Sequence, residues 1–318
     1  MKVYQSTRDL FSDKATKEGP FYSFTIGNFD GVHLGHRHLL KEFVKAAHAE
    51  KSLAVLVTFT PHPLKIFNPA IAHFLLSPLE EKRKLLEDLN LDAILEIPFN
   101  RDFSLLSPED FLQQTLLFAP EKVKEIHLGD DFLFGNNRRG DIHLLRQMSK
   151  KLNPQIKVVE FSEFSLEGKR ITSTLLRDLI KKGELAHVPR YLGRPYSLSS
   201  LVIKERGRGR TIGFPTANLS LHEDWLVPSR GVYISETRRK EKIYQSVTNV
   251  GITPTFEERL KITIETHLLD FDDDLYGEKI EVSFLKKLRG EIKFNSVDEL
   301  VEQIQKDVLS CRDYFKAL

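Results

Sequence analysis

Length, composition and charge narrow the class of protein first. The chain has 318 residues, of which 41% are hydrophobic and 29% charged, so it has the composition of a globular protein and a length that suits two domains. Its formal net charge of +2 gives no reason to expect nucleic acid or an anionic membrane as a partner. The single cysteine, Cys311, cannot form an internal disulfide, and no apolar run is long enough for a signal peptide or a membrane span. We therefore expect a cytoplasmic protein, and the sequence leaves its oligomeric state open.

The first half of the chain alternates short apolar segments with amphipathic ones. Residues 23–26 and 53–59 have the composition of buried strands, and the second segment is apolar almost throughout, as central parallel strands are. Residues 36–50 between them place an apolar stripe on one face of a helix. The alternation continues with helices at 78–89, 107–117, 141–151 and from about 173, and with strands at 92–97, 123–128 and 157–161. This order predicts an α/β domain with a doubly wound, mostly parallel sheet.

After Gly183 the pattern becomes that of an all-β domain. The segments are short, rich in β-branched and aromatic residues, and separated by turn residues: 196–203, 231–237, 244–250, 261–269 and 279–285. This predicts a small antiparallel barrel or sandwich. Residues 296–315 form a last helix, with Ser296 and Glu299 as a capping box. We place the boundary within 183–195 and expect domains at 1–185 and 186–318.

The first motif with chemical meaning is GNFDGVHLGH at residues 27–36, directly after the first buried strand. The start of a helix offers free backbone N–H groups and a partial positive charge, which makes it a natural phosphate site. Gly35 would permit a phosphate to approach closely, and His33 and His36 could donate hydrogen bonds to it. A tight turn with two surface histidines is the alternative.

Three further segments follow strand ends or open a helix. His62 lies in TFTPHP after the second buried strand, and Asp130 lies in GDDFLFG after a later one. Ligands usually bind at such ends in open α/β sheets. Ser173 and Thr174 open a helix, and Arg177 one turn on can reach the same phosphate.

These four segments together resemble the bacterial FAD synthetases of the HxGH nucleotidyltransferase superfamily. The resemblance implies that the phosphate of FMN attacks the α-phosphorus of ATP and that pyrophosphate leaves. It assigns His33, His36 and Arg177 to catalysis. It assigns nucleotide or flavin binding to the remaining motif residues: Gly27, Phe29, Asp30, Gly35, His62, Asp130, Ser173 and Thr174.

The second half has its own motif, GRGRTIGFPTAN at residues 207–218, which resembles the signature of riboflavin kinases. Glycines there let backbone amides approach phosphates. The resemblance assigns ligand binding to Gly207, Arg210, Gly213, Pro215, Asn249 and Arg289. Thr216 and Asn218 would hold Mg²⁺ on ATP through neutral oxygens. Glu265 would accept the proton of the ribityl hydroxyl, and an exposed arginine with no ligand is the alternative for Arg289.

The resemblance covers about residues 24–308 and is to the bifunctional riboflavin kinase/FMN adenylyltransferase family. It implies a Rossmann-like nucleotidyltransferase domain, then a six-stranded kinase barrel with a terminal helix. The expected ligands are riboflavin, FMN, FAD and ATP, with Mg²⁺ and without nucleic acid or membrane. One alternative is a riboflavin kinase whose first domain binds nucleotide but is inactive. Another is a nucleic-acid-binding protein that uses KKLRG, RRG and GRGR, which predicts affinity falling steeply with salt.

Overall fold

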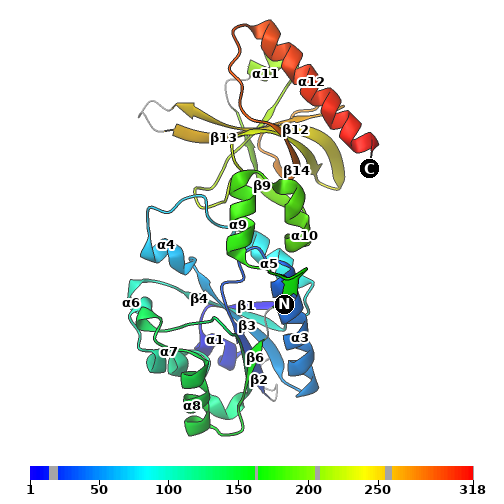
Figure 1. The fold of residues 1–318 in the computed structure, drawn as a ribbon. Coiled ribbons are helices and arrows are strands. Elements are labelled where there is room, and N and C mark those ends of the chain that lie inside the picture. Colours follow the sequence, from blue (N-terminus) through cyan, green and yellow to red (C-terminus); the bar gives the residue numbers. More distant parts are fainter. Residues whose placement is uncertain (14–20, 162–163, 205–207, 255–259, 318) are drawn as a thin grey trace. The chain divides into compact units, whose positions relative to one another are not determined.

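The computed structural model describes residues 1–13, 21–161, 164–204, 208–254 and 260–317. The chain folds into two compact units, which Figure 1 traces in the colours of the sequence. Unit 1 comprises Met1–Ile71 and Ser77–Thr172, and unit 2 comprises Ala72–Leu76 and Ser173–Leu318. A short segment of the first half of the sequence therefore belongs to the second unit.

Unit 1 is built on a six-stranded sheet in which every neighbouring pair of strands is parallel. The strands run in the order β1-β4-β3-β2-β5-β6. Their bounds are β1 (Lys2–Tyr4), β2 (Tyr22–Ile26), β3 (Leu53–Thr60), β4 (Ala93–Pro98), β5 (Val123–Gly129) and β6 (Lys157–Phe161). The chain moves from β2 to β3 on one side and later to β5 on the other, so the order reverses at β2. In open α/β sheets a ligand site lies at such a reversal, outside the carboxyl ends of the strands.

Helices cover both faces of this sheet. Their bounds are α1 (Thr7–Ser12), α3 (Leu34–Ala49), α4 (Pro63–Phe67), α5 (Leu79–Glu87), α6 (Arg101–Ser104), α7 (Pro108–Gln114) and α8 (Ile142–Leu152). A two-stranded ribbon of β7 (Ser165–Leu166) and β8 (Lys169–Arg170) follows, and 3₁₀ turns lie at Pro120–Lys122 and Asn136–Arg138. Ser107 caps α7 by accepting a hydrogen bond from the backbone N–H of Asp110, with Pro108 at the first helical position.

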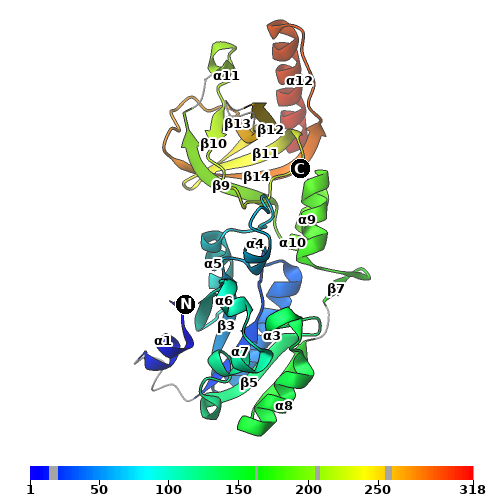
Figure 2. The same ribbon diagram turned by 90° about the vertical axis from the view of Figure 1, so that its left-hand side faces the viewer.

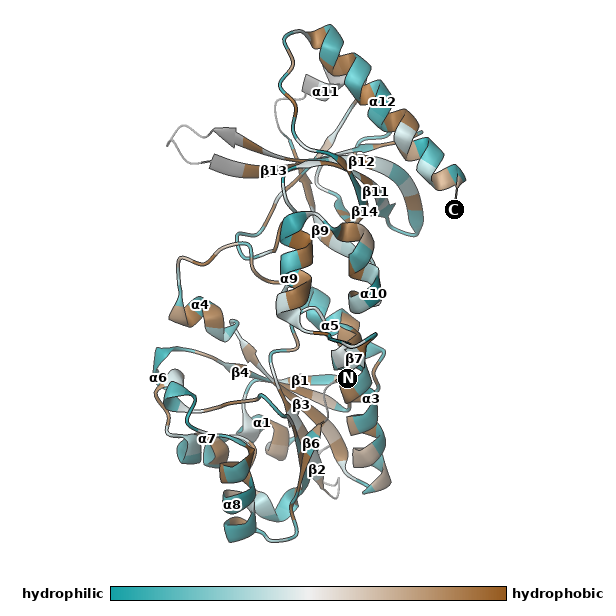
Figure 3. Cartoon of the chain, in the orientation of Figure 1, coloured by the Kyte–Doolittle hydropathy of each residue, from teal (hydrophilic) through white to brown (hydrophobic). Residues whose placement is uncertain are grey.

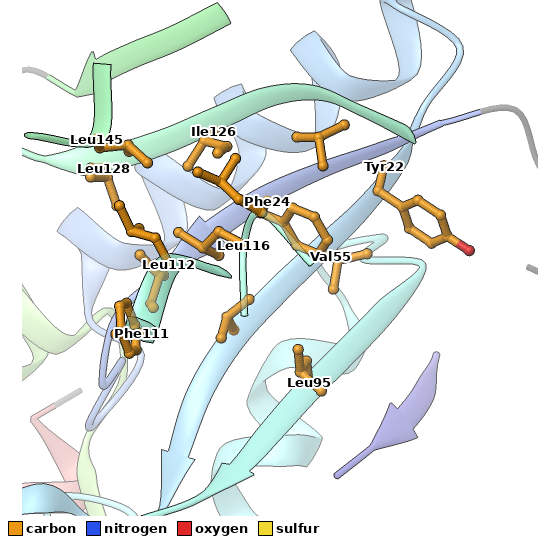
Figure 4. Packing of buried hydrophobic residues seen from close by; sticks show 14 of the residues in the cluster. Tyr22, Phe24, Val55, Leu95, Phe111, Leu112, Leu116, Ile126, Leu128 and Leu145 are labelled. Atoms are coloured by element: carbon orange, nitrogen blue, oxygen red, sulfur yellow. The ribbon is translucent and has the colours of Figure 1, made fainter. Parts of the chain in front are cut away.

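The core of unit 1 has two layers because side chains of a strand alternate between its faces. On one face Val55 and Val57 pack with Phe111 and Leu112 of α7. Figure 4 shows this layer from close by. On the other face, residues from β3 and β4 pack against α3 and α5: Ala54, Leu56 and Ile94 with Leu40, Phe43, Val44, Ala47 and Leu86. Figure 3 shows β3 as largely hydrophobic, whereas α8 and α12 each carry hydrophobic and hydrophilic residues.

Unit 2 contains a closed barrel with the strand order β10-β13-β12-β11-β14-β9. Neighbouring strands of the barrel pair in antiparallel fashion, and Figure 2 shows the barrel from a second direction. The strands are β9 (Tyr196–Ile203), β10 (Ala217–Leu219), β11 (Gly231–Arg239), β12 (Lys242–Pro254), β13 (Leu260–Leu268) and β14 (Lys279–Arg289). The helices are α9 (Ser173–Lys182), α10 (Val188–Leu192), α11 (Arg208–Thr211) and α12 (Val297–Lys316), with a 3₁₀ turn at Leu185–His187.

The terminal helix α12 begins at its N-cap Ser296, as the sequence predicts, and packs on the barrel. Cys311 of this helix is buried among Val232, Ile234 and Val247, and burial raises the pKa of its thiol to about 11. The thiol is therefore protonated at neutral pH and a poor nucleophile.

Both predicted fold classes are confirmed, and so are most of the predicted elements. The strands β1 and β10 are not predicted by the sequence, since three residues are too few to show a period. Within the part of the chain that the structure describes, no helix combines the length and the apolar character that crossing a membrane requires.

A buried histidine on β5 makes the stability of unit 1 sensitive to acid. His127 has 3% of its surface exposed, and its Nε2 lies 2.9 Å from Oε2 of Glu125. Its ring contacts Phe43 and Phe161. Burial lowers the pKa of His127 from the ordinary 6.5, and the hydrogen bond to Glu125 offsets this only in part.

Below pH 6.5 the unfolded chain therefore takes up a proton at His127 before the folded chain does. Stability is expected to fall as the pH drops from that value toward the lowered pKa. His127→Gln keeps a donor for Glu125 and removes the titration. Chemical unfolding at about pH 7.5 and about pH 5.5 should show a smaller loss of stability for this variant than for the parent chain. An identical pH dependence in both proteins would contradict this assignment.

Candidate functional sites

The loop after β2 is held in an unusual backbone conformation. Phe29, Gly31 and Val32 have φ angles of 48°, 83° and 40°. The left-handed region suits glycine but is strained for a β-branched residue such as Val32. The N–H of Gly27 donates to the carbonyl oxygen of Val57 on β3, which fixes where the loop leaves the sheet. The surrounding contacts must therefore hold the loop in place, as is frequent at functional sites.

The two motif histidines lie together at the N-terminus of α3. His33 is the N-cap residue, and its Nδ1 accepts a hydrogen bond of 3.2 Å from the backbone N–H of His36. The two rings stack with centroids 3.6 Å apart, and the ring of Phe29 meets that of His36 edge-on at 5.1 Å. Because Nδ1 of His33 accepts, its neutral ring carries the proton on Nε2 and can donate there.

Gly35 lies close to the ring of His33. A Cβ added at Gly35 would lie 3.2 Å from Nδ1 of His33 and 3.6 Å from the carbonyl oxygen of Ile171. Any larger residue would therefore crowd the histidine that caps the helix. With α3 running for 16 residues, its N-terminus has the dipole and the N–H groups that attract an anion. The geometry fits a phosphate site formed by this turn.

Other predicted site residues of unit 1 follow β3 and β5, the two strands that flank β2 in the sheet. His62 is half-buried after β3 and caps α4, where its Nδ1 accepts from the backbone N–H of Leu64 at 3.2 Å. Asp130 follows β5, and its Oδ1 lies 3.1 Å from a guanidinium nitrogen of Arg170. Carboxyl ends of parallel strands share one edge of the sheet, so both loops lie at the edge where α3 begins.

Aromatic rings gather beside His62. Phe59, Phe99 and Phe103 have ring centroids 5.5–6.2 Å apart, and Phe67 of α4 lies 5.9 Å from Phe99. Phe67 has 57% of its surface exposed. Phe59 belongs to the core and Phe99 and Phe103 pack against it, so of these four rings Phe67 is the one that this edge of the sheet exposes.

Two charged side chains near the loop, those of Asp30 and Lys82, are buried. The carboxylate of Asp30, predicted as a ligand contact, is buried and accepts a hydrogen bond of 3.0 Å from the backbone N–H of Ser77. Ser77 Oγ in turn accepts from the N–H of Gly31 at 3.0 Å. Lys82 of α5 is also buried there, and its position on the apolar stripe of the helix, in line with Leu86, is the signal that could have revealed it.

The remaining residues of the first set belong to unit 2. Ser173 and Thr174 begin α9, and Arg177 lies one turn further on. Nε of Arg177 donates to the carbonyl oxygen of Phe74 at 2.8 Å. The N–H of Phe74 donates to the carbonyl oxygen of Asp224 at 2.9 Å, so residues 72–76 are tied to this unit by backbone hydrogen bonds as well.

In the kinase motif, Gly209 permits a tight turn. The N–H of Phe214 donates to the carbonyl oxygen of Gly209 at 2.9 Å, and Gly213 has a φ of 85°. Nδ1 of His267 lies 2.8 Å from the carbonyl oxygen of Pro215 and steadies the following residues. Of the other predicted residues, Gly207 lies outside the described part of the chain and Arg210 belongs to α11.

A Cβ added at Gly209 would lie 2.3 Å from the carbonyl oxygen of Phe214, so the turn must move to accept a side chain. Backbone strain of this kind costs of order 1–3 kcal/mol. We expect Gly209→Ala to lower kcat/KM for phosphorylation of riboflavin by about tenfold or more. Initial rates of FMN formation measure this, with adenylylation of added FMN as the control in the same protein. Unchanged phosphorylation would show that the turn does not shape the kinase site.

The polar residues predicted for the kinase site form a row across three strands. Glu265 on β13 lies directly opposite Asn218 on β10 and Asn249 on β12. Residues directly opposite each other share a face and are near neighbours. Thr216 lies beside the turn, because its Oγ1 is 3.3 Å from the position of a Cβ on Gly209. One carboxylate, two amides and a hydroxyl thus gather next to the glycine turn.

Arg289 has an internal partner at the end of β14. Its Nε lies 3.0 Å and 3.1 Å from the two carboxylate oxygens of Asp307 on α12. Gln303 donates to the same carboxylate at 3.0 Å. This pair ties β14 to the terminal helix, and a contact between Arg289 and a ligand stays a prediction.

Together these features define a class of enzyme: an α/β nucleotidyltransferase domain and a β-barrel kinase domain in one chain. A family model described as FAD synthetase matches residues 16–175, and one described as riboflavin kinase matches residues 192–315. A crystal structure described as a macrolide-efflux protein from Streptococcus pneumoniae is 27% identical and has a TM-score of 0.83 over 98% of both chains.

Curated relatives match over almost the whole chain. The bifunctional riboflavin kinase/FMN adenylyltransferase of Buchnera aphidicola is 38% identical over 297 residues, which is 92% of this chain and 94% of the relative. The enzyme of the same name from Escherichia coli strain K12 is 37% identical over 316 residues, or 99% and 98% of the two chains. The chain belongs to the family of bifunctional riboflavin kinases/FMN adenylyltransferases.

Proposed function

We propose that this chain phosphorylates riboflavin to FMN and then adenylylates FMN to FAD, with ATP as the co-substrate of both reactions. The adenylyltransferase domain is proposed at 1–185 and the kinase domain at 186–318. The observation that carries most weight is the presence of both constellations in one chain: two histidines at the start of α3, and Glu265 between two asparagines of the barrel.

In adenylyl transfer, a phosphate oxygen of FMN attacks the α-phosphorus of ATP and pyrophosphate leaves. The nucleophile is already an anion, so the protein needs no covalent intermediate and acts by positioning and by stabilising charge. His33 and His36 at the positive end of α3 support a role as donors to the phosphates. Arg177, Ser173 and Thr174 are proposed to add further donors at the start of α9.

Different observations support the different residues that we propose to bind substrate around the two histidines. Gly27, Phe29 and Gly35 shape the turn, and Asp30 fixes it from within. His62 and Asp130 follow strands at the same edge of the sheet. The apolar rings beside His62 suit the flat isoalloxazine ring of a flavin, which needs apolar faces to contact.

In the kinase reaction, the terminal ribityl hydroxyl of riboflavin attacks the γ-phosphorus of ATP and ADP leaves. Glu265 takes the hydroxyl proton as the new P–O bond forms. The amides of Asn218 and Asn249 on either side of it can orient the hydroxyl or a phosphate oxygen. Gly213, Pro215, Gly207 and Arg210 of the motif, together with Arg289, complete the proposed binding set.

Magnesium is proposed as the metal of the kinase site. The donor set fits, because Thr216, whose hydroxyl lies beside the glycine turn, and Asn218, two residues further on, supply neutral oxygens. Mg²⁺ prefers oxygen ligands and usually binds through few protein groups together with substrate phosphates. When bound, it would neutralise charge on the phosphates of ATP.

A cytoplasmic location also stays a prediction, and it rests on the single cysteine of the chain.

Supplying FMN directly tests the second activity apart from the first. Purified protein with FMN, ATP and magnesium should form FAD and pyrophosphate in equal amounts. A chain that is only a riboflavin kinase would release no pyrophosphate from this mixture. A chain that binds nucleic acid would show neither the flavin nor the magnesium dependence.

A further inference from the structure

A buried lysine lies directly behind the histidine loop. Lys82 is on α5, where Leu86 and Leu89 continue the same stripe into the core. It has 7% of its surface exposed. Lysine is rarely buried unless its ammonium group has partners, because a charge that leaves water loses several kcal/mol of solvation. The burial of Lys82 therefore indicates that its ammonium group interacts with polar partners inside unit 1.

The ammonium group of Lys82 joins the end of β3 to the loop after β2. Its Nζ lies 3.1 Å from Oγ1 of Thr58 and 3.4 Å from the carbonyl oxygen of Asn28. Oγ1 of Thr58 donates to the same carbonyl oxygen at 3.3 Å. The ammonium group of Lys82 and the hydroxyl group of Thr58 thus both bind the backbone carbonyl oxygen of Asn28. Asn28 directly precedes Phe29, whose φ is 48°.

Burial lowers the pKa of Lys82, and the neighbouring charges offset this only in part. Asp30 and Glu96 act on it as anions and raise its pKa, while burial, the largest effect, and Arg83 lower it. Glu96 also pairs with Arg83, whose Nε donates to Oε1 of Glu96 at 2.8 Å. Asp30 also fixes Ser77, which accepts from Gly31. These contacts connect the loop to the start of α5 and to the neighbouring strand ends.

We propose that Lys82 is a positioning residue for adenylyl transfer, which holds the strained loop from Asn28 to Val32 so that His33 and His36 meet the phosphates in the reactive arrangement. The inference rests on the proposed role of the two histidines. Lys82 itself is too buried to be assigned a contact with substrate. It acts through the carbonyl group of Asn28 and through Thr58.

The test compares Lys82→Met with Lys84→Met. Both variants remove an ammonium group from α5, but Lys84 is exposed and pairs only loosely with Glu81 at 3.3 Å. We expect Lys82→Met to lower kcat for FAD formation from FMN by about 100-fold, as a misplacement of about 1 Å does, with KM for ATP changed less than about threefold. Phosphorylation of riboflavin, which we assign to unit 2, should stay equal in both variants and in the parent chain, and far-UV circular dichroism should show that unit 1, which contains Lys82, is folded.

A second pair of variants decides the matter if Lys82→Met fails to fold. Thr58→Val removes the hydroxyl at nearly constant volume, and Thr58→Ser keeps it. Loss of kcat in Thr58→Val alone supports the proposal, because a purely structural role would move the unfolding temperature and not the turnover of folded enzyme. Equal turnover in Lys82→Met and Lys84→Met, or in the two Thr58 variants, would overturn it. If the parent chain makes no FAD from FMN, the proposed function has failed and not the role of Lys82.

Discussion

Replacing Glu265 with glutamine is expected to lower the rate of riboflavin phosphorylation by about 10³-fold, within the range measured for loss of a general base. Glutamine has nearly the same shape as glutamate, but it cannot take up the proton of the attacking hydroxyl. Adenylylation of added FMN should continue at the parent rate. Initial rates of FMN and FAD formation measure both effects.

Glu236→Gln is the matched control for this prediction. Glu236 is a half-buried carboxylate on β11 of the same barrel, opposite Gln245. It lies outside the row of Asn218, Glu265 and Asn249. Equal kinase rates in Glu236→Gln and Glu265→Gln would remove Glu265 from the reaction and leave the hydroxyl to be activated by another group.

The second large effect is expected at His33. Asparagine is among the best N-cap residues, so His33→Asn retains the cap of α3 and removes the Nε2–H donor. Loss of one preorganised donor to a reacting phosphate should reduce kcat for FAD formation by about 10²–10³-fold. Riboflavin phosphorylation should be unchanged in the same protein. Chromatography of the flavins after single-substrate assays with riboflavin or FMN measures the two rates.

His48→Asn provides the control on the same helix. His48 lies in the last turn of α3, where it pairs with Asp92 at 2.9 Å on the surface. Exposed pairs of this kind contribute little to stability. Comparable losses of FAD formation in His33→Asn and His48→Asn would mean that the helix as a whole matters and not the donor at its start.

Much of the fold could be predicted from the sequence because its periods are strong. The strand β3 is apolar along nearly its whole length, and α12 shows an apolar stripe behind a capping serine. The short strands β1 and β10 have no period, and β10 begins inside a motif whose residues indicate ligand binding more clearly than a strand. Pairing with β9 and β13 makes it a strand, and such pairing depends on residues far away in the chain.

The candidate sites were predictable where a motif is contiguous. The cap by His33, its contact with His36 and the tight approach at Gly35 all lie within four residues. Contacts between distant residues gave no such signal. Asp30 meets Ser77 across 47 positions, and Arg177 meets Phe74 across 103. For Asp30 and Arg289, which were predicted to touch ligands, the structure adds internal partners that residue type alone could not reveal.

Lys82 shows how a buried charge can be overlooked. Its helix is predicted from the sequence, but a lysine on a helix is ordinarily expected on the solvated face, whereas its spacing from Leu86 and Leu89 places it on the apolar one. A charged residue on an apolar stripe indicates either a buried partner or a functional site. At Lys82 the partners are the loop and the strand end that carry the proposed chemistry.

If one chain carries out two consecutive reactions, both should be visible in a single time course. Purified protein is incubated with riboflavin, ATP and magnesium, and the flavins are separated by chromatography at successive times. FMN should rise first and FAD should follow at its expense. Accumulation of FMN with no FAD would contradict the assignment of His33 and His36 to adenylyl transfer, and the absence of both products would contradict the account of both sites.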